Sequence, residues 1–88
     1  MWVRSVSRLP NLSGAGIIKI LVRDFGFQIA RQKGSHVILR KYISGRKVVT
    51  VVPMHKEVKT GTLLGILELG EISKDEFLNK IRYEYRSR

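Results

Sequence analysis

Four consecutive residues, Lys33-Gly34-Ser35-His36, combine the groups that acid–base attack on a phosphodiester requires. A glycine in a tight turn lets the backbone approach a phosphate closely, and neighbouring N–H groups can form an anion-binding concavity. The serine adds another hydrogen-bond donor. Histidine titrates near neutral pH, so a histidine held rigidly at the start of a strand could take up or release a proton. Taken alone, however, this tetrapeptide is also typical of a purely structural turn.

A second histidine, His55, lies between Met54 and Lys56, shortly after a run of valines. If the chain forms an antiparallel meander, this segment and the start of the strand at His36 lie at the same end of the sheet. Two histidines beside one phosphate could divide the acid and base roles, with Lys33 and Lys56 binding the phosphate. His55 could equally be an exposed loop residue that only helps to bind substrate.

Positive charge is concentrated around these histidines. The chain has 17 Lys and Arg against 7 Asp and Glu, a formal net charge of +10. Between residues 31 and 59 there is one acid, Glu57, against eight basic residues: Arg31, Lys33, Arg40, Lys41, Arg46, Lys47, Lys56 and Lys59. Such a field attracts polyanions such as RNA, although it could also dock an acidic protein or aid solubility. Tyr42, inside this segment, is the aromatic residue best placed to stack on a base.

The residues that are missing also restrict the chemistry. The chain has no cysteine, so it has no disulfide, thiol nucleophile or cysteine-based metal site. Metal-dependent nucleases use clustered carboxylates, but only Asp24 and Glu57 lie near the basic segment, and they are far apart in the sequence. We therefore expect no metal and no cofactor. The attacking group would then be the ribose 2′-OH, so RNA would be cut and DNA spared.

No apolar stretch approaches the ~20 residues that span a bilayer, and the N-terminus lacks the apolar core of a secretory signal. We therefore expect a cytoplasmic protein without membrane contact.

Hydrophobic spacing indicates the elements that must position these residues. Ser13 is a plausible N-cap for a helix over residues 13–24, and Gly26 follows where a glycine commonly ends a helix. Three β-like runs follow at residues 27–32, 36–43 and 47–52, separated by turn signals. Loose alternation in the first run places Phe27 and Ile29 on one side. The third run is so rich in valine that its sequence does not indicate which of its two faces is buried.

Two further helices follow the third run. One opens at Thr60 and ends at Gly70, and the next begins at Ser73, which forms a capping box with Glu76. Each helix has one apolar stripe to bury, so the economical packing is an α+β fold with a three-stranded antiparallel sheet and helices on one face. The opposite face of the sheet then stays open, and the basic residues could lie on this open face. We divide the chain into a basic N-terminal arm (residues 1–11), the domain (12–81) and a basic C-terminal tail (82–88).

Read in order, six stretches form one pattern: Leu9-Pro10-Asn11-Leu12-Ser13-Gly14, Phe25-Gly26-Phe27, Arg31-Gln32-Lys33-Gly34-Ser35-His36, Val52-Pro53-Met54-His55, Lys59-Thr60-Gly61-Thr62-Leu63 and Ile72-Ser73-Lys74-Asp75-Glu76-Phe77. This pattern, spanning about residues 9–81, closely resembles the HicA (YcfA-like) mRNA interferase toxins. The resemblance implies a fold like the double-stranded RNA-binding domain and ribosome-independent cleavage of mRNA. It also implies neutralisation by a HicB-type antitoxin, through which alone the toxin would meet DNA.

The resemblance assigns the catalytic role to His36, with Gly34 and Ser35 at the flanking positions of the motif. His55 matches a histidine that is common but not universal in the family, and Thr60 replaces a usual proline. The leading hypothesis is therefore the ribonuclease toxin of a type II toxin–antitoxin pair. A non-catalytic RNA-binding module and a protein that docks an acidic partner are the alternatives.

Overall fold

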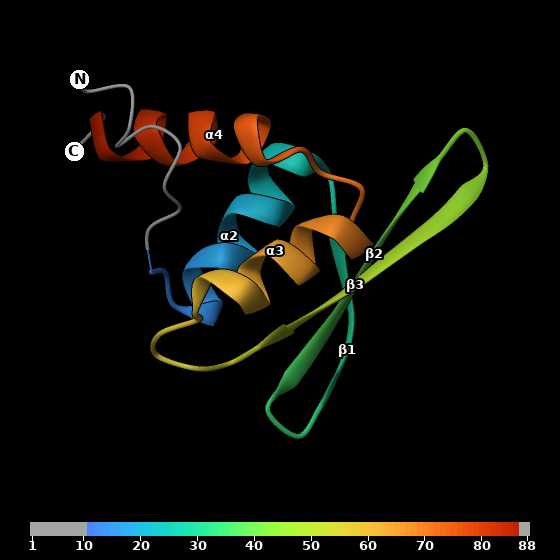
Figure 1. Ribbon diagram of the computed structural model, residues 1–88. Coiled ribbons are helices and arrows are strands. Elements are labelled where there is room, and N and C mark those ends of the chain that lie inside the picture. Colours follow the sequence, from blue (N-terminus) through green and yellow to red (C-terminus); the bar gives the residue numbers. More distant parts are fainter. Residues whose placement is uncertain (1–10, 87–88) are drawn as a thin grey trace.

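The computed structural model describes the backbone of residues 11–86 and the side chains as far as residue 81. The proposed N-terminal arm therefore lies almost entirely outside the described residues. The elements follow in the order α2 (Gly14–Phe25), β1 (Gln28–Lys33), β2 (His36–Ile43), β3 (Arg46–Pro53), α3 (Thr60–Leu69) and α4 (Lys74–Arg86). The predicted order and α+β class, similar to the double-stranded RNA-binding domain, are confirmed. Figure 1 shows the three helices gathered on one side of the sheet.

Local signals at both ends of α2 set its bounds. The Ser13 side chain caps the helix by accepting a hydrogen bond from the Gly16 N–H at 3.0 Å. At the other end Gly26 adopts a left-handed conformation (φ 76°), and the next N–H, from Phe27, bonds back to the Leu21 carbonyl at 3.1 Å. The helix predicted over residues 13–24 is confirmed to within one residue at each end.

The sheet has the strand order β1-β2-β3, and both strand pairs are antiparallel. The β2–β3 ladder is regular from His36 opposite Pro53 to Ile43 opposite Arg46. Its two-residue turn, Ser44-Gly45, has φ values of 52° and 80°, as a type I′ turn requires. The β1–β2 ladder is interrupted between Ile29 and Arg31, so Ala30 is the extra residue of a β-bulge.

Burial shows which face of the sheet meets the helices. Val37 and Leu39 on β2 and Val48 and Val52 on β3 are at most 4% exposed. Thr50 lies between those valines on the same face, fully buried, and its hydroxyl donates to the Ile66 carbonyl of α3 at 2.8 Å. The structure thus settles the face of the third run. The opposite face of the sheet carries no helix (Figure 1).

The two apolar residues at the start of the first run differ in burial. Ile29 lies opposite the inward-pointing Leu39 but is 56% exposed, whereas Phe27 is 1% exposed. Phe27 precedes β1, and the Lys41 ammonium lies 4.8 Å from the centroid of its ring. Every residue of β1 itself is exposed, because β1 is an edge strand that the helices do not cover.

The two C-terminal helices complete the core. The Ser73 hydroxyl accepts from the Glu76 N–H at 3.0 Å, which confirms the predicted cap of α4. Helix α4 continues to Arg86 and so includes most of the segment assigned to a tail. The buried apolar cluster draws on all three helices, β2, β3 and the connecting segments: Ile17, Ile18, Ile20, Leu21, Phe27, Val37, Leu39, Val48, Val52, Val58, Leu63, Ile66, Leu67, Ile72, Phe77, Leu78 and Ile81. No helix within the described residues is long and apolar enough to cross a membrane.

Candidate active site on the open face of the sheet

The strand register determines which side chains share the open face, because directly opposed residues in antiparallel strands point to the same side. Val37 and Leu39 point to the helices, so the alternate residues of β2 point away from them. With their partners on β1 and β3 they form four rows: Lys33–His36–Pro53, Arg31–Ile38–Val51, Gln28–Arg40–Val49 and Tyr42–Lys47. The open face therefore carries cations and an aromatic ring around a strip of aliphatic side chains.

The turn between β1 and β2 holds His36 at the edge of this face. Gly34 has a φ of 61°, which favours glycine, and Lys33 lies directly opposite His36. The Gln32 side-chain amide donates to the Gly34 carbonyl at 3.0 Å and so braces the turn. His36 itself is exposed, so its imidazole can meet a polymer in solution.

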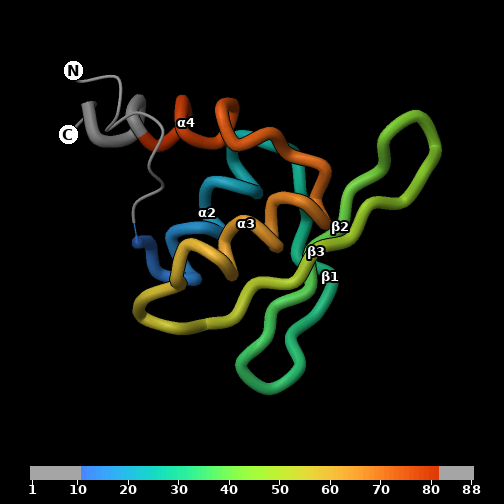
Figure 2. The backbone as a smooth tube through the Cα atoms, in the orientation of Figure 1, coloured from blue at the N-terminus to red at the C-terminus, as the bar shows by residue number. Residues whose placement is uncertain are grey.

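Three backbone hydrogen bonds fix the loop that follows β3. The Met54 N–H donates to the Ser35 carbonyl at 2.7 Å, and the Gly14 N–H donates to the His55 carbonyl at 2.9 Å. The Val58 N–H donates to the Leu12 carbonyl at 2.7 Å. Figure 2 shows this loop swinging past the first turn of α2. The expectation that the start of β2 and the end of β3 lie at the same end of the sheet is confirmed.

Gly14 makes this close approach possible. A Cβ atom at position 14 would lie 2.0 Å from the carbonyl oxygen of Pro53 and 3.1 Å from the Cα of Met54. Only a residue without a side chain lets the first turn of α2 sit directly against the end of β3. The helix thereby positions the backbone of His55 next to the turn that carries His36.

The eight basic residues of the central segment divide by their surroundings. The fold uses two of them: the Lys41 ammonium donates to the Phe25 carbonyl at 3.0 Å, and Arg46 forms a two-pronged ion pair with Glu71 at 2.6 and 2.9 Å. Hydrogen bonding to Arg46 holds the pKa of the Glu71 carboxyl below its ordinary value. The side chains of the other six form no hydrogen bond or ion pair with the described residues: Arg31, Lys33, Arg40, Lys47, Lys56 and Lys59.

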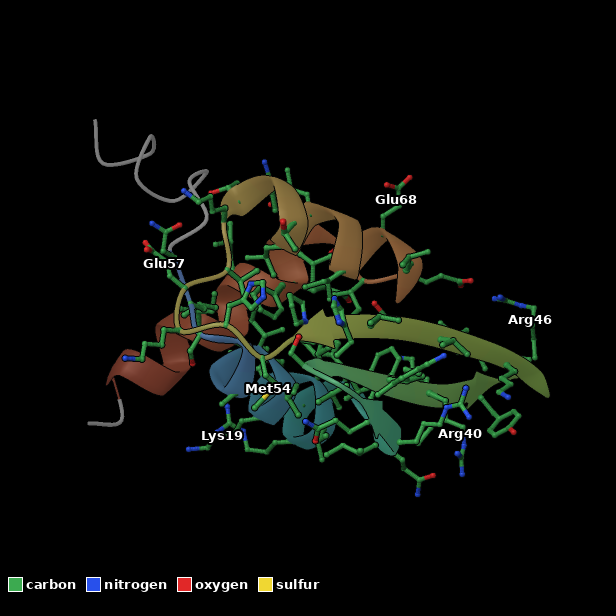
Figure 3. The ribbon with its side chains drawn as sticks, turned by 90° about the horizontal axis from the view of Figure 1, so that it is seen from below. Lys19, Arg40, Arg46, Met54, Glu57 and Glu68 are labelled. Atoms are coloured by element: carbon green, nitrogen blue, oxygen red, sulfur yellow. The ribbon has the colours of Figure 1, made fainter. Side chains whose placement is uncertain are left out.

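The acids are segregated from these cations. None of the seven Asp and Glu residues lies in a strand. Figure 3 shows Arg40 of the sheet and Glu68 of α3 pointing to opposite sides of the molecule. The open face of the sheet is therefore positive without internal compensation.

A family model described as "HicA toxin of bacterial toxin-antitoxin" matches residues 14–72. The chain belongs to the HicA toxin family. The matched range begins at the first residue of α2 and includes the whole sheet, both histidines and α3. No curated protein and no solved structure matches the chain. Membership of a toxin–antitoxin family implies an antitoxin as a partner for this HicA-family chain.

The predicted site residues of this HicA-family toxin fall into two groups. Lys33, Gly34, Ser35 and His36 lie together at one end of the sheet, and His55 and Lys56 are exposed on the adjoining loop. The remaining three extend away from that end: Arg31 in the second row, Arg40 in the third and Tyr42 in the last. Tyr42 is six residues from His36 along β2, which is about 20 Å at the rise of a strand.

Lys47 is not among the predicted site residues, although it lies directly opposite Tyr42 on the open face. A sequence signal for it exists. A two-residue turn at Ser44-Gly45 pairs the residues on either side of it in order, which places residue 47 opposite residue 42.

Two other features bear on ligands of the HicA-family fold. Within the described residues, no three His, Cys, Asp or Glu side chains are grouped so that they could hold a metal ion. A hollow of about 470 Å³ between the end of α2 and α4 is lined by Asp24, Phe25, Lys41, Glu76, Asn79 and Lys80. This hollow includes none of the predicted site residues, so the candidate active site is a surface of the sheet that is separate from it.

Proposed function

We propose that this HicA-family toxin is a metal-independent endoribonuclease that cleaves mRNA in the cytoplasm and so inhibits translation. In the proposed reaction the ribose 2′-OH attacks the adjacent phosphodiester. The 2′-oxygen forms a bond to phosphorus as the bond to the 5′-oxygen breaks, which leaves a 2′,3′-cyclic phosphate and a 5′-hydroxyl. His36 acts as general base or general acid in this transfer.

The observation that carries the proposal is the position of His36. Its side chain is exposed on a positive face, directly opposite Lys33 and at the exit of the Gly34-Ser35 turn. A histidine buried in the core would be out of reach of RNA, so the exposure of this one meets a necessary condition. Lys33 at the end of β1 and Lys56 on the loop after β3 are both exposed and are proposed to bind the phosphate.

The proposal is tested by incubating purified protein with RNA in EDTA. The wild type should generate products that end in a cyclic phosphate, and a 2′-O-methyl group at the cleaved nucleotide should block the reaction. His36→Ala should lower the rate by roughly 10²–10⁴-fold, the usual contribution of an acid–base group. Because His36 is exposed, the melting temperature of this variant should stay close to that of the wild type.

The matched control is His55→Ala, an exposed histidine on the adjoining loop. If His55 shares the acid–base chemistry, its loss should lower the rate as strongly as the loss of His36. If it only helps to bind RNA, the Michaelis constant should rise and kcat should hold. Undiminished cleavage by His36→Ala would overturn the assignment of the catalytic residue, and products with a 3′-hydroxyl would overturn 2′-OH attack.

One observation favours the alternative of a non-catalytic RNA-binding module. Catalytic histidines are commonly oriented by a hydrogen bond to a carboxylate or carbonyl group. Neither His36 nor His55 makes a side-chain hydrogen bond to any described residue. The alternative predicts salt-dependent RNA binding without new RNA ends, and equal inhibition of growth by the wild type and His36→Ala.

The partner proposed for this toxin is a HicB-type antitoxin. The six cations without a partner among the described residues favour an antitoxin that presents acidic side chains to the open face and masks His36. In this scheme the toxin does not contact DNA itself and approaches it only through the antitoxin complex. Addition of the antitoxin should therefore protect RNA in the cleavage assay.

A further inference from the structure

We infer that the open face of the sheet binds a single RNA strand, which runs from His36 to a base-stacking position at Tyr42. The inference rests on the proposed function only for the identity of the polymer as RNA. It concerns which form of RNA is bound and where the strand lies. The distinction matters because the fold class resembles domains that bind duplex RNA.

The composition of the face argues for a single strand. A duplex presents phosphates and 2′-hydroxyls and keeps the faces of its bases stacked inside, so it offers little to apolar side chains. Here Tyr42 is 61% exposed and Val49 is 38% exposed on the same face, with half-buried Ile38 and Val51 between them and His36. Apolar and aromatic surface flanked by cations is the usual combination for binding unpaired bases and their backbone.

The cations follow the same path. Lys33 lies in the row of His36, Arg31 in the next row, Arg40 in the third, and Lys47 in the row of Tyr42. Each row of the open face thus contains one basic residue, and none of the four is paired with a described acid. These cations lie on β2 or on a strand beside it, so an RNA backbone that lies along β2 would have a positive charge next to it in each row.

Arg40 is the best-defined of these cations. Its side chain is half buried in the sheet, and its Nε is covered from solvent without a hydrogen-bond partner among the described residues. Packing against neighbouring rows therefore holds this guanidinium in place, and no acid among the described side chains neutralises it. A fixed and uncompensated guanidinium suits a phosphate.

The far end of the path lies where the sheet has only two strands. The last β1–β2 pair is Gln28 with Arg40, so Tyr42 and Lys47 lie on a two-stranded ribbon beyond the end of β1. Figure 1 shows this ribbon projecting beyond the helices. The ion pair between Arg46 and Glu71 ties its tip to the junction of α3 and α4. The path of about 20 Å suits about four nucleotides, at the lower end of the site sizes of small β-sheet binders.

The test measures binding by the His36→Ala protein, so that it does not depend on cleavage. The probes are fluorescein-labelled oligouridylates of two, four, eight and twelve nucleotides and a twelve-base-pair RNA duplex. Affinity should rise steeply up to about four nucleotides, and the single-stranded twelve-mer should bind at least 10-fold more tightly than the duplex. Equal or tighter binding of the duplex would overturn the inference.

Substitutions at Tyr42 test the stacking position. Tyr42→Ala should weaken binding of the eight-mer by about 5- to 150-fold, as expected for the loss of one stacked base, and Tyr42→Phe should bind like the parent. Leu69→Ala is the matched control, because Leu69 is 60% exposed on α3 and lies on the helical side. If Tyr42→Ala behaves like Leu69→Ala, or if Tyr42→Phe loses as much as Tyr42→Ala, a stacking role for Tyr42 is wrong.

The outcomes for the site and for the reaction are separable. Tyr42-dependent binding of single strands, together with a wild-type protein that cuts no RNA, would support the path described here and refute the nuclease. Cleavage without preference for single strands would support the nuclease and refute the path.

Discussion

Replacing Gly14 with alanine should destabilise the protein, although the same change stabilises most helices. Alanine at a helical position is normally favoured over glycine by about 1 kcal/mol. Here the added Cβ would lie 2.0 Å from the Pro53 carbonyl oxygen, whereas real Cβ contacts essentially never fall below 3.0 Å. The first turn of α2 and the end of β3 would therefore have to separate by about 1 Å.

A movement of that size has two costs that exceed the gain in helix propensity. Overpacking a tight contact typically costs about 1–3 kcal/mol. The separation would also stretch the 2.9 Å hydrogen bond from the Gly14 N–H to the His55 carbonyl, which is worth about 1 kcal/mol. We expect the free energy of unfolding to fall by about 2 kcal/mol and the melting temperature to fall by about 8–16 °C.

The assay is urea and thermal unfolding followed by far-UV circular dichroism, in the His36→Ala background that the proposed function predicts to be non-toxic during expression. Gly65→Ala is the matched control. Gly65 lies in the middle of α3, and a Cβ there would meet nothing within 4 Å, so this variant should gain about 0.5–1 kcal/mol. A Gly14→Ala protein as stable as the wild type would show that the helix and strand are not in the contact described here.

Three further predictions concern the core, the ribbon and the open face. Thr50→Val should lower the free energy of unfolding by only about 0.5–1 kcal/mol, because the Ile66 carbonyl, which loses the Thr50 hydroxyl as a donor, still accepts from the Gly70 N–H. A loss above about 3 kcal/mol in urea unfolding would contradict this. The lowered pKa of Glu71 means that its carboxylate adds stability above pH 4.5, and that this stability is lost as the pH falls below that value. The melting temperature of Glu71→Gln should therefore fall less than that of the wild type when the pH is lowered. An unchanged pH profile would refute the pairing with Arg46. Lys47→Gln should lower the slope of log binding constant against log salt concentration for RNA by about 0.7. Arg46→Gln should leave this slope unchanged, because Arg46 already pairs with Glu71. Equal slopes for the two variants would contradict the division of the cations into side chains with and without a partner among the described residues.

The features that the sequence predicts well are those with local causes. The Ser13 cap and the left-handed Gly26 act within one turn of α2, so both ends of that helix could be predicted. The Gly34 and Ser44-Gly45 turns likewise depend on φ values that few residues adopt easily. His36 could therefore be placed at the start of a strand from its neighbours alone.

The sequence could not predict which face of β3 is buried, because valines occupy both alternating sets of positions in the strand. A partner distant in the sequence determines the buried face. Thr50 turns inward because the α3 carbonyl at Ile66 accepts its hydroxyl, and the valines on either side of Thr50 then point outward to the open face. No local pattern indicates that a helix sixteen residues later supplies that acceptor.

The joint at Gly14 escapes sequence analysis for a related reason. Local propensity treats a glycine in the first turn of a helix only as a weakness. Its role appears when Pro53, from the far end of the sheet, packs against it. The position of His55 depends on that contact. The sequence could therefore place His36 at the start of a strand, but the position of His55 beside it could be established only from the three-dimensional structure.

The bulge at Ala30 determines which side of the molecule carries Arg31 and Lys33. In an uninterrupted β1 these two side chains would share the parity of Ile29, which lies opposite the inward-pointing Leu39. One additional alanine shifts the phase, and both cations emerge beside His36 instead. Related toxins should therefore be aligned by counting backward from the glycine turn. Counting forward from the first helix would assign the same two charges to the wrong side whenever a relative lacks the extra residue.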